Sequence, residues 1–220
     1  MHQPSKSLLD IALDNYDIQA SRYFTEQNEL KNLPADVRKK RDKEHERTKR
    51  LLDSQRMNAE AVASIQAKLD EYRDQGKRLV SERGATGIEG RKVLEQEKHH
   101  PTRKLGRYMI ADGNPKPSPE HAAHHIVPGK GRTQEPYRAR AHMHTRGIRI
   151  NDPDNGVWLP RYKKHTPHWS MPEALSHLEY HTIGYETRVS QAVRRKQTES
   201  QIRSELRFIA KLLQENKFPV

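Results

Sequence analysis

The sequence predicts an α+β protein: a mostly helical chain with a small pair of strands in its second half. Apolar residues recur at intervals of three and four over residues 5–30, 36–82 and 202–213, as on one face of a helix. Two short apolar runs, residues 126–127 and 157–159, are bounded by Pro or Gly, as small strands are. Because only 32% of residues are apolar and 32% are charged, part of the helical chain is expected to be solvated rather than packed in a core.

The first half of the chain is expected to form helices with little apolar surface. Residues 5–30 form the first helix, and the break at residues 33–36 starts a second one. Residues 36–82 then make one long charged helix whose narrow apolar seam packs against one neighbour. The seam consists of Val62, Ile65, Leu69, Tyr72, Gly76 and Leu79. We therefore assign residues 1–100 to a helical region with a structural, delivery or interaction role.

The second half changes in character after a further helix, expected over residues 91–111. Residues 114–119 are rich in proline and predict a stiff connector. Residues 128–151 are expected to be a long basic loop, and the chain returns to helix after Pro172. The last helix buries one side, formed by Ile202, Leu206, Ile209 and Leu213. Residues 101–220 are assigned to the domain that carries the chemistry.

Charge and composition narrow the function. Residues 1–100 hold 20 Lys and Arg against 18 Asp and Glu, whereas residues 101–220 hold 21 against 11. A basic domain favours a polyanionic partner such as nucleic acid. The absence of cysteine excludes disulfides, cysteine-ligated zinc and cysteine nucleophiles. We expect no membrane-spanning segment and, because the N-terminus lacks an apolar core, no cleaved secretory signal.

Histidines gather where catalysis is expected, since 11 of the 13 lie between residues 99 and 181. His124 and His125 adjoin one of the short strands, and neighbours on a strand point to opposite faces. His177 and His181 have the spacing that puts two rings on one face of a helix, as chelation requires. Imidazoles both bind metals and accept protons near neutral pH. This pattern predicts a metal site beside a general base.

Four stretches in this order resemble a known family. They are residues 105–113 (LGRYMIADG), 122–128 (AAHHIVP), 147–160 (GIRINDPDNGVWLP) and 177–182 (HLEYHT). Together they resemble the AHH family of toxin nucleases in the His-Asn-His (HNH) and endonuclease VII superfamily. The resemblance extends over residues 103–193 and leaves residues 1–100 outside it.

The resemblance implies a ββα-metal motif, two strands and a helix that hold one divalent cation. His124 would be a metal ligand and His125 the general base. Asn155 would be the Asn of the motif, holding the hairpin and orienting the base. His177 and His181 would complete the metal site.

Other polar residues have alternative roles. His165 and His168 also follow the second strand and are rival metal ligands; otherwise they contact phosphate or stack on bases. His121 either helps to bind substrate or, as we favour, is an exposed loop residue. We interpret Trp158 as core, while Trp169 either stacks on a base or packs. Residues expected to contact nucleic acid are Arg146, Arg149, Arg161, Lys163, His165 and His168.

The predicted function is a metal-dependent endonuclease, with DNA as the substrate and a 5′ phosphate on the product. Magnesium is the expected metal, with zinc, nickel or manganese as alternatives. The resemblance implies an antibacterial toxin released by a secretion system such as type VI and acting in the target-cell cytoplasm. Its partners would be an acidic immunity protein and a secretion component or chaperone. A non-catalytic nucleic-acid-binding protein, a housekeeping or phage nuclease, and an RNase are the competing hypotheses.

Overall fold

The computed structural model describes residues 7–81 and 85–219, and the chain forms two compact units. The N-terminal unit is Met1–Ala67 and the C-terminal unit is Lys68–Val220. The helix α2 (Ala35–Ser81) passes from the first unit into the second. The assignment of functional roles to residues 1–100 and 101–220 stays a prediction.

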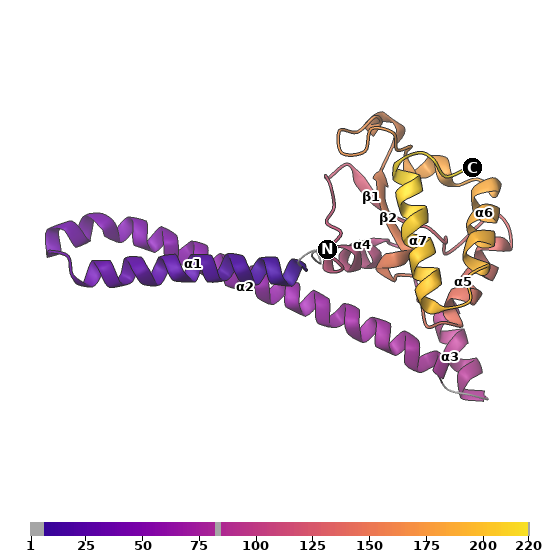
Figure 1. Ribbon diagram of the computed structural model, residues 1–220, viewed down its shortest axis with the longest axis horizontal. Helices are drawn as coiled ribbons and strands as arrows, with labels where there is room; N and C mark the ends of the chain where they lie inside the picture. Colours follow the sequence, from indigo (N-terminus) through magenta and orange to yellow (C-terminus); the bar gives the residue numbers. More distant parts are fainter. Residues whose placement is uncertain (1–6, 82–84, 220) are drawn as a thin grey trace, which may run out of the picture. The chain divides into compact units, whose positions relative to one another are not determined.

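The N-terminal unit is a helical hairpin of α1 (Leu8–Lys31) and the first part of α2 (Figure 1). Ser7 starts α1 because its hydroxyl accepts a hydrogen bond from the Asp10 amide, 3.1 Å away. Pro34, just before α2, suits a turn since it cannot continue the first helix. Across the hairpin the rings of Tyr23 and His45 stack with centroids 4.7 Å apart.

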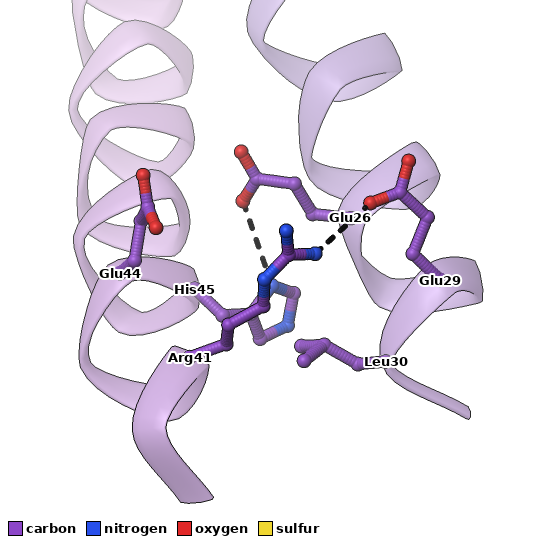
Figure 2. A pocket seen from close by; sticks show the side chains of 6 residues that line it. All are labelled: Glu26, Glu29, Leu30, Arg41, Glu44 and His45. Carbon is purple, nitrogen blue, oxygen red and sulfur yellow. Dashed lines mark hydrogen bonds and ion pairs between the residues drawn. The ribbon is translucent and has the colours of Figure 1, made fainter. Parts of the chain in front are cut away.

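A small polar pocket lies at the turn end of this hairpin (Figure 2). Its volume is about 160 Å³. Arg41 pairs with Glu29 at 3.4 Å, and His45 lies 3.8 Å from Glu26. The ion pair of Arg41 and Glu29 crosses the hairpin, so the pocket is explained by polar contacts that join the two helices.

The second part of α2 buries the end of the predicted seam. Leu69 and Tyr72 are buried, and a side chain at Gly76 would collide with the carbonyl of Gly147. Close approach of two backbones therefore requires glycine at this position. Within the C-terminal unit the seam packs against later segments of the chain, as its narrow width predicts.

Two helices occupy the region where one was expected. α3 (Ala85–Glu95) and α4 (Arg103–Ala111) are separated by residues 96–102. Pro101 lies in this interval, and proline lacks the amide hydrogen that a continuous helix needs. The expectation of one helix over residues 91–111 was wrong for this reason.

The sheet of the C-terminal unit is the antiparallel pair β1 (His121–His125) and β2 (Gly156–Pro160). Its register places His124 opposite Val157 and His125 opposite Gly156. The first strand lies just before the apolar pair at 126–127 rather than on it. Those two residues instead point into the main core, where both are fully buried.

The segment between the strands also differs from the expectation. α5 (Glu135–His144) lies within residues 128–151, which were expected to be irregular. Pro136 stands in its first turn, where a missing amide hydrogen costs nothing. The prolines, glycines and charges of this stretch obscured a helix that packs along α6 (Ile183–Arg194).

α6 and α7 (Glu199–Gln214) complete the core, and α7 packs against both α6 and β2 (Figure 1). The four residues expected on the buried side of the last helix are all at most 1% exposed. Short 3-10 turns lie at Pro153–Asn155 (η1), Lys163–His165 (η2) and His177–Tyr180 (η3). The α+β prediction is confirmed. In the described part of the chain, no helix has the length and apolarity to cross a membrane.

A buried ion-pair network holds η1 against α7. The Arg203 guanidinium lies 2.9 Å from Asp152 and 2.6 Å from Asp154, and both carboxylates are almost fully buried. Arg73 from α2 and Arg207 from α7 also contact Asp154. The loop that leads into β2 is therefore tied to two helices.

Candidate active site

The histidine pair of β1 is buried, and its two rings face different surroundings. The ring of His124 lies beside those of His177 and His181. The ring of His125 instead contacts the side chain of Asn151. This divergence is what the alternation of side chains along a strand predicts.

One cavity of about 350 Å³ adjoins both members of the pair. It is lined by residues 100–102, 122–125 and 128–130, together with His177 and His181. A substrate group in this cavity would reach the three-ring cluster and His125 at the same time.

The three-ring cluster comes from three elements. His124 lies on β1 and His177 begins η3, while His181 directly precedes α6. The Thr182 hydroxyl accepts a hydrogen bond from the Tyr185 amide and so starts α6 one residue after His181. The two histidines of the HxxxH pair therefore do not share a helix, contrary to the helical spacing argument, although their rings still lie 6.0 Å apart.

The spacing of these rings is close to what a metal site needs. The ring centroid of His124 is 6.2 Å from that of His177 and 5.3 Å from that of His181. Imidazoles bound to a tetrahedral ion through nitrogen at 2.0–2.1 Å have centroids about 5.2 Å apart. Among residues 7–81 and 85–219, no three ligating side chains are already in place around one point. Small ring movements would close this set.

Two further observations fit a metal. The Nδ1 atom of His177 is buried and, among the described residues, has no hydrogen-bond partner, a state that a ligand would relieve. Burial lowers the pKa of His124 well below 6.5, with help from the neighbouring imidazoles of His181 and His177. Burial also lowers the pKa of His177 and the pKa of His181. The neighbouring charge of His177 lowers the pKa of His181 further. Neutral imidazole is the form that binds metals.

Tyr185 orients the buried ring of His124. Its hydroxyl donates to the carbonyl of Ile126 at 2.8 Å and lies 3.2 Å from Nε2 of His124. Since the single hydroxyl hydrogen is used, Nε2 of His124 must be the donor to the tyrosine oxygen. The lone pair of His124 is then on Nδ1, which is available to a metal.

The opposite ring, that of His125, has the character of a base. Burial lowers its pKa to about 4, although the hydrogen bond with Asn151 acts to raise it. The ring is therefore neutral near pH 7 and able to accept a proton. The rings of His99 and His100 lie 6.2 and 6.3 Å from it. Sequence reasoning assigned no role to Asn151, His99 or His100.

The side-chain hydrogen bonds of Asn155 hold the hairpin and go to backbone groups rather than to His125. Its side chain is fully buried and accepts from the amide of Val127 at 2.8 Å. Its amide group donates to the carbonyls of Val127 and Ile150 at 3.2 and 2.9 Å. The side chain that contacts His125 is Asn151, four residues earlier.

The rival ligand pair has other partners. His168 is buried, and its two ring nitrogens lie within 3.2 Å of Ser118 Oγ and 2.9 Å of Ser170 Oγ. Its ring also contacts His121, which is fully buried on β1 and was wrongly interpreted as an exposed loop residue. His165 lies on η2 beside Tyr162. The structure brings neither His165 nor His168 into the three-ring cluster.

The residues expected to contact nucleic acid are divided by the structure. Arg146, Arg161 and Lys163 are exposed. Arg149 is only 7% exposed and lies in an ion pair with Glu97 at 2.8 Å, so it is not on the surface. The prediction for Arg149 was wrong because it was made from charge alone, and the sequence does not distinguish a buried arginine from an exposed one.

A second cavity, of about 680 Å³, shares residues 101–102, 122–123 and His177 with the first. Trp158 lies in its wall and is buried as expected, whereas Trp169 is 80% exposed. Among the described residues that line it, none is acidic. Its basic side chains are Arg103, Arg107, Lys116 and Arg161. We call it the basic groove; it offers a polyanion a path to the histidines.

One of the comparisons with known proteins gives a match. Residues 105–215 match AHH, a nuclease family of the HNH/ENDO VII superfamily with conserved AHH. The matched range includes the sequence Ala123-His124-His125. No curated protein and no solved structure matches the chain.

Proposed function

Because the chain belongs to the AHH nuclease family of the HNH/endonuclease VII superfamily, we propose that it is a metal-dependent endonuclease that cleaves DNA. We further propose that it acts as a secreted antibacterial toxin. The observation that carries the enzymatic proposal is the meeting of the three-ring cluster and the neutral His125 at one cavity.

Each histidine has a distinct task in this proposal. His124, His177 and His181 would hold a divalent cation. When bound, the cation would neutralise a phosphate oxygen and stabilise the departing 3′ oxygen. His125 takes a proton from the attacking water, whose oxygen bonds to phosphorus as the bond to the 3′ oxygen breaks. The product carries a 5′ phosphate.

Substrate binding relies on the basic groove. Its four cationic side chains would pair with successive phosphates and guide the strand toward the cavity. The exposed Arg146 and Lys163 would add contacts outside it. DNA is our proposed substrate, and RNA is tested beside it.

Magnesium is the proposed working ion, since phosphoryl chemistry commonly uses it. The three imidazoles, however, are ligands that zinc, nickel or manganese accept more readily than magnesium does. The assay therefore compares all four ions. A requirement for zinc or nickel alone would replace magnesium without changing the proposed reaction.

The toxin role brings partners of predictable chemistry. We propose delivery by a bacterial secretion system such as type VI, with action in the cytoplasm of the target cell. A chaperone or secretion component would bind the helical N-terminal region. A cognate immunity protein would be acidic, because it must cover the basic groove.

The test is cleavage of supercoiled plasmid and of a matched RNA by the purified full chain, with each metal and with chelator. The His125→Ala variant removes the base, and His45→Ala, in the N-terminal unit, is the control. We expect metal-dependent nicking of DNA by the wild type and by His45→Ala, and none by His125→Ala. Salt-sensitive binding without cleavage under any metal would favour a binding protein, and cleavage of RNA alone would favour an RNase.

Expression in a bacterial host tests the toxin role. We expect growth arrest and loss of chromosomal DNA with the wild type and normal growth with His125→Ala. Normal growth with an enzyme that is active in vitro would favour a housekeeping or phage nuclease.

A further inference from the structure

The buried side of the His125 ring contacts the side-chain amide of Asn151. Nε2 of His125 lies 3.1 Å from Oδ1 of Asn151, and Asn151 is fully buried. A carbonyl oxygen can only accept a hydrogen bond, so Nε2 must carry the ring hydrogen. The lone pair of the neutral ring is then on Nδ1.

The orientation of that amide is itself fixed. Nδ2 of Asn151 donates to Oε1 of Glu97 at 2.9 Å and to the carbonyl of Lys98 at 3.0 Å. A reversed amide would direct its oxygen at two other acceptors and leave the NH₂ group against His125. Because this would break two buried hydrogen bonds, the opposite orientation is strongly disfavoured.

Glu97 is held in place as a charged acceptor. Its carboxylate receives hydrogen bonds from Arg149 at 2.8 Å, from the Tyr72 hydroxyl at 2.8 Å and from Lys104 at 3.1 Å. The Arg149 guanidinium lies over the Tyr72 ring, 4.0 Å from its centroid. Every contact in this chain of groups lies within the C-terminal unit.

Four members of the network lie before the range that matches the nuclease family. Tyr72 belongs to α2, Glu97 and Lys98 follow α3, and Lys104 lies on α4, whereas the family match begins at residue 105. Residues outside the matched range therefore take part in this network.

We infer that Asn151, oriented by Glu97, is the positioning residue of the proposed nuclease: it holds His125 in the tautomer whose Nδ1 accepts the proton from water. This inference rests on the proposed function for its catalytic consequence. The tautomer itself is a property of the protein that can be measured without substrate.

The first readout is the long-range proton–nitrogen spectrum of the imidazoles in ¹⁵N-histidine protein, without metal at neutral pH. Comparison with His125→Ala identifies the His125 signals. We expect the wild-type ring to carry its hydrogen on Nε2. In Asn151→Ala the ring should lose this preference and show a mixture of tautomers.

The second readout is steady-state cleavage of an oligonucleotide duplex. For Asn151→Ala we expect kcat to fall about 100-fold, the contribution of a correctly placed general base, with KM within about threefold of wild type, since the basic groove is untouched. Zinc affinity serves as the folding control, because the three-ring cluster lies on the other face of β1.

An isosteric exchange separates positioning from folding. Asn151→Asp places a carboxylate against that of Glu97 and should lower kcat, while its oxygen still accepts from Nε2 of His125 and keeps the tautomer. Combining it with Glu97→Gln restores one donor and one acceptor between the two side chains, so the double variant should recover kcat relative to Asn151→Asp.

Two results would overturn the inference. One is a wild-type His125 ring protonated on Nδ1. The other is an Asn151→Ala variant that keeps the tautomer and a kcat within twofold of wild type. A wild-type protein that holds the Nε2 tautomer but cleaves nothing would instead overturn the proposed function.

Discussion

The replacement of Asn155 by alanine tests whether this side chain fastens the hairpin of the site. Asn155 is fully buried and makes three hydrogen bonds, to the amide and carbonyl of Val127 and to the carbonyl of Ile150. Alanine leaves these backbone groups without partners. A buried group left unpaired costs about 1–3 kcal/mol, and water entering the vacated space offsets part of the loss. We expect the free energy of unfolding to fall by about 3–5 kcal/mol.

Urea denaturation followed by tryptophan fluorescence is the assay. Both tryptophans, Trp158 and Trp169, lie in the C-terminal unit, so the signal reports on the unit that contains the hairpin. The control is Gln191→Ala, at an exposed position of α6 in the same unit, where alanine should have little effect. A loss below about 1 kcal/mol for Asn155→Ala, with an unchanged denaturant slope, would refute the claim that Asn155 fastens the two segments.

Three further predictions concern metal, acid and buried charge. His177→Ala should weaken zinc binding by at least about 100-fold in calorimetry, while His165→Ala should leave it unchanged; equal effects would place the metal elsewhere. Burial lowers the pKa of His144 to about 4. As the pH falls below 6.5, this histidine is therefore protonated in the unfolded chain before it is protonated in the folded one. The free energy of unfolding falls over this range until the folded form is protonated too. Between pH 7 and pH 5, the free energy of unfolding of His144→Leu should therefore fall by about 2 kcal/mol less than that of the wild type. Parallel plots of stability against pH for the two proteins would contradict this cause. Arg203→Met leaves two buried aspartates with fewer partners and should cost about 3 kcal/mol in the urea assay, whereas a neutral result would mean that the remaining arginines suffice.

The structural elements that could be predicted from the sequence are those that show as periodic apolar residues or as a characteristic spacing. The regular apolar intervals of α1, α2 and α7 come from side chains that face one direction, so these helices were evident. The break at Pro101 was missed because the surrounding apolar spacing continues through it. α5 was missed because its proline and its charges resemble a loop, and only packing along α6 identifies it as a helix.

The candidate site was predictable in part for similar reasons. His124, His177 and His181 do come together, although the HxxxH pair meets across a helix start instead of along one helix. The contact between Asn151 and Glu97 joins residues 54 positions apart, and no local pattern marks such a pair. The burial of Arg149 likewise depends on which segments pack over it.

The pairing of two identical residues on β1 has a consequence for how this site can change. His124 and His125 are the same amino acid, so exchanging their order in the gene would alter nothing. What distinguishes them is a tyrosine on one side and an asparagine on the other. The difference between the two rings is therefore set by their neighbours, and a single inserted or deleted residue in this strand would turn each ring toward the opposite face. Point substitutions around the pair can adjust the site gradually, but a change of length in β1 would reverse the faces of both rings in one step.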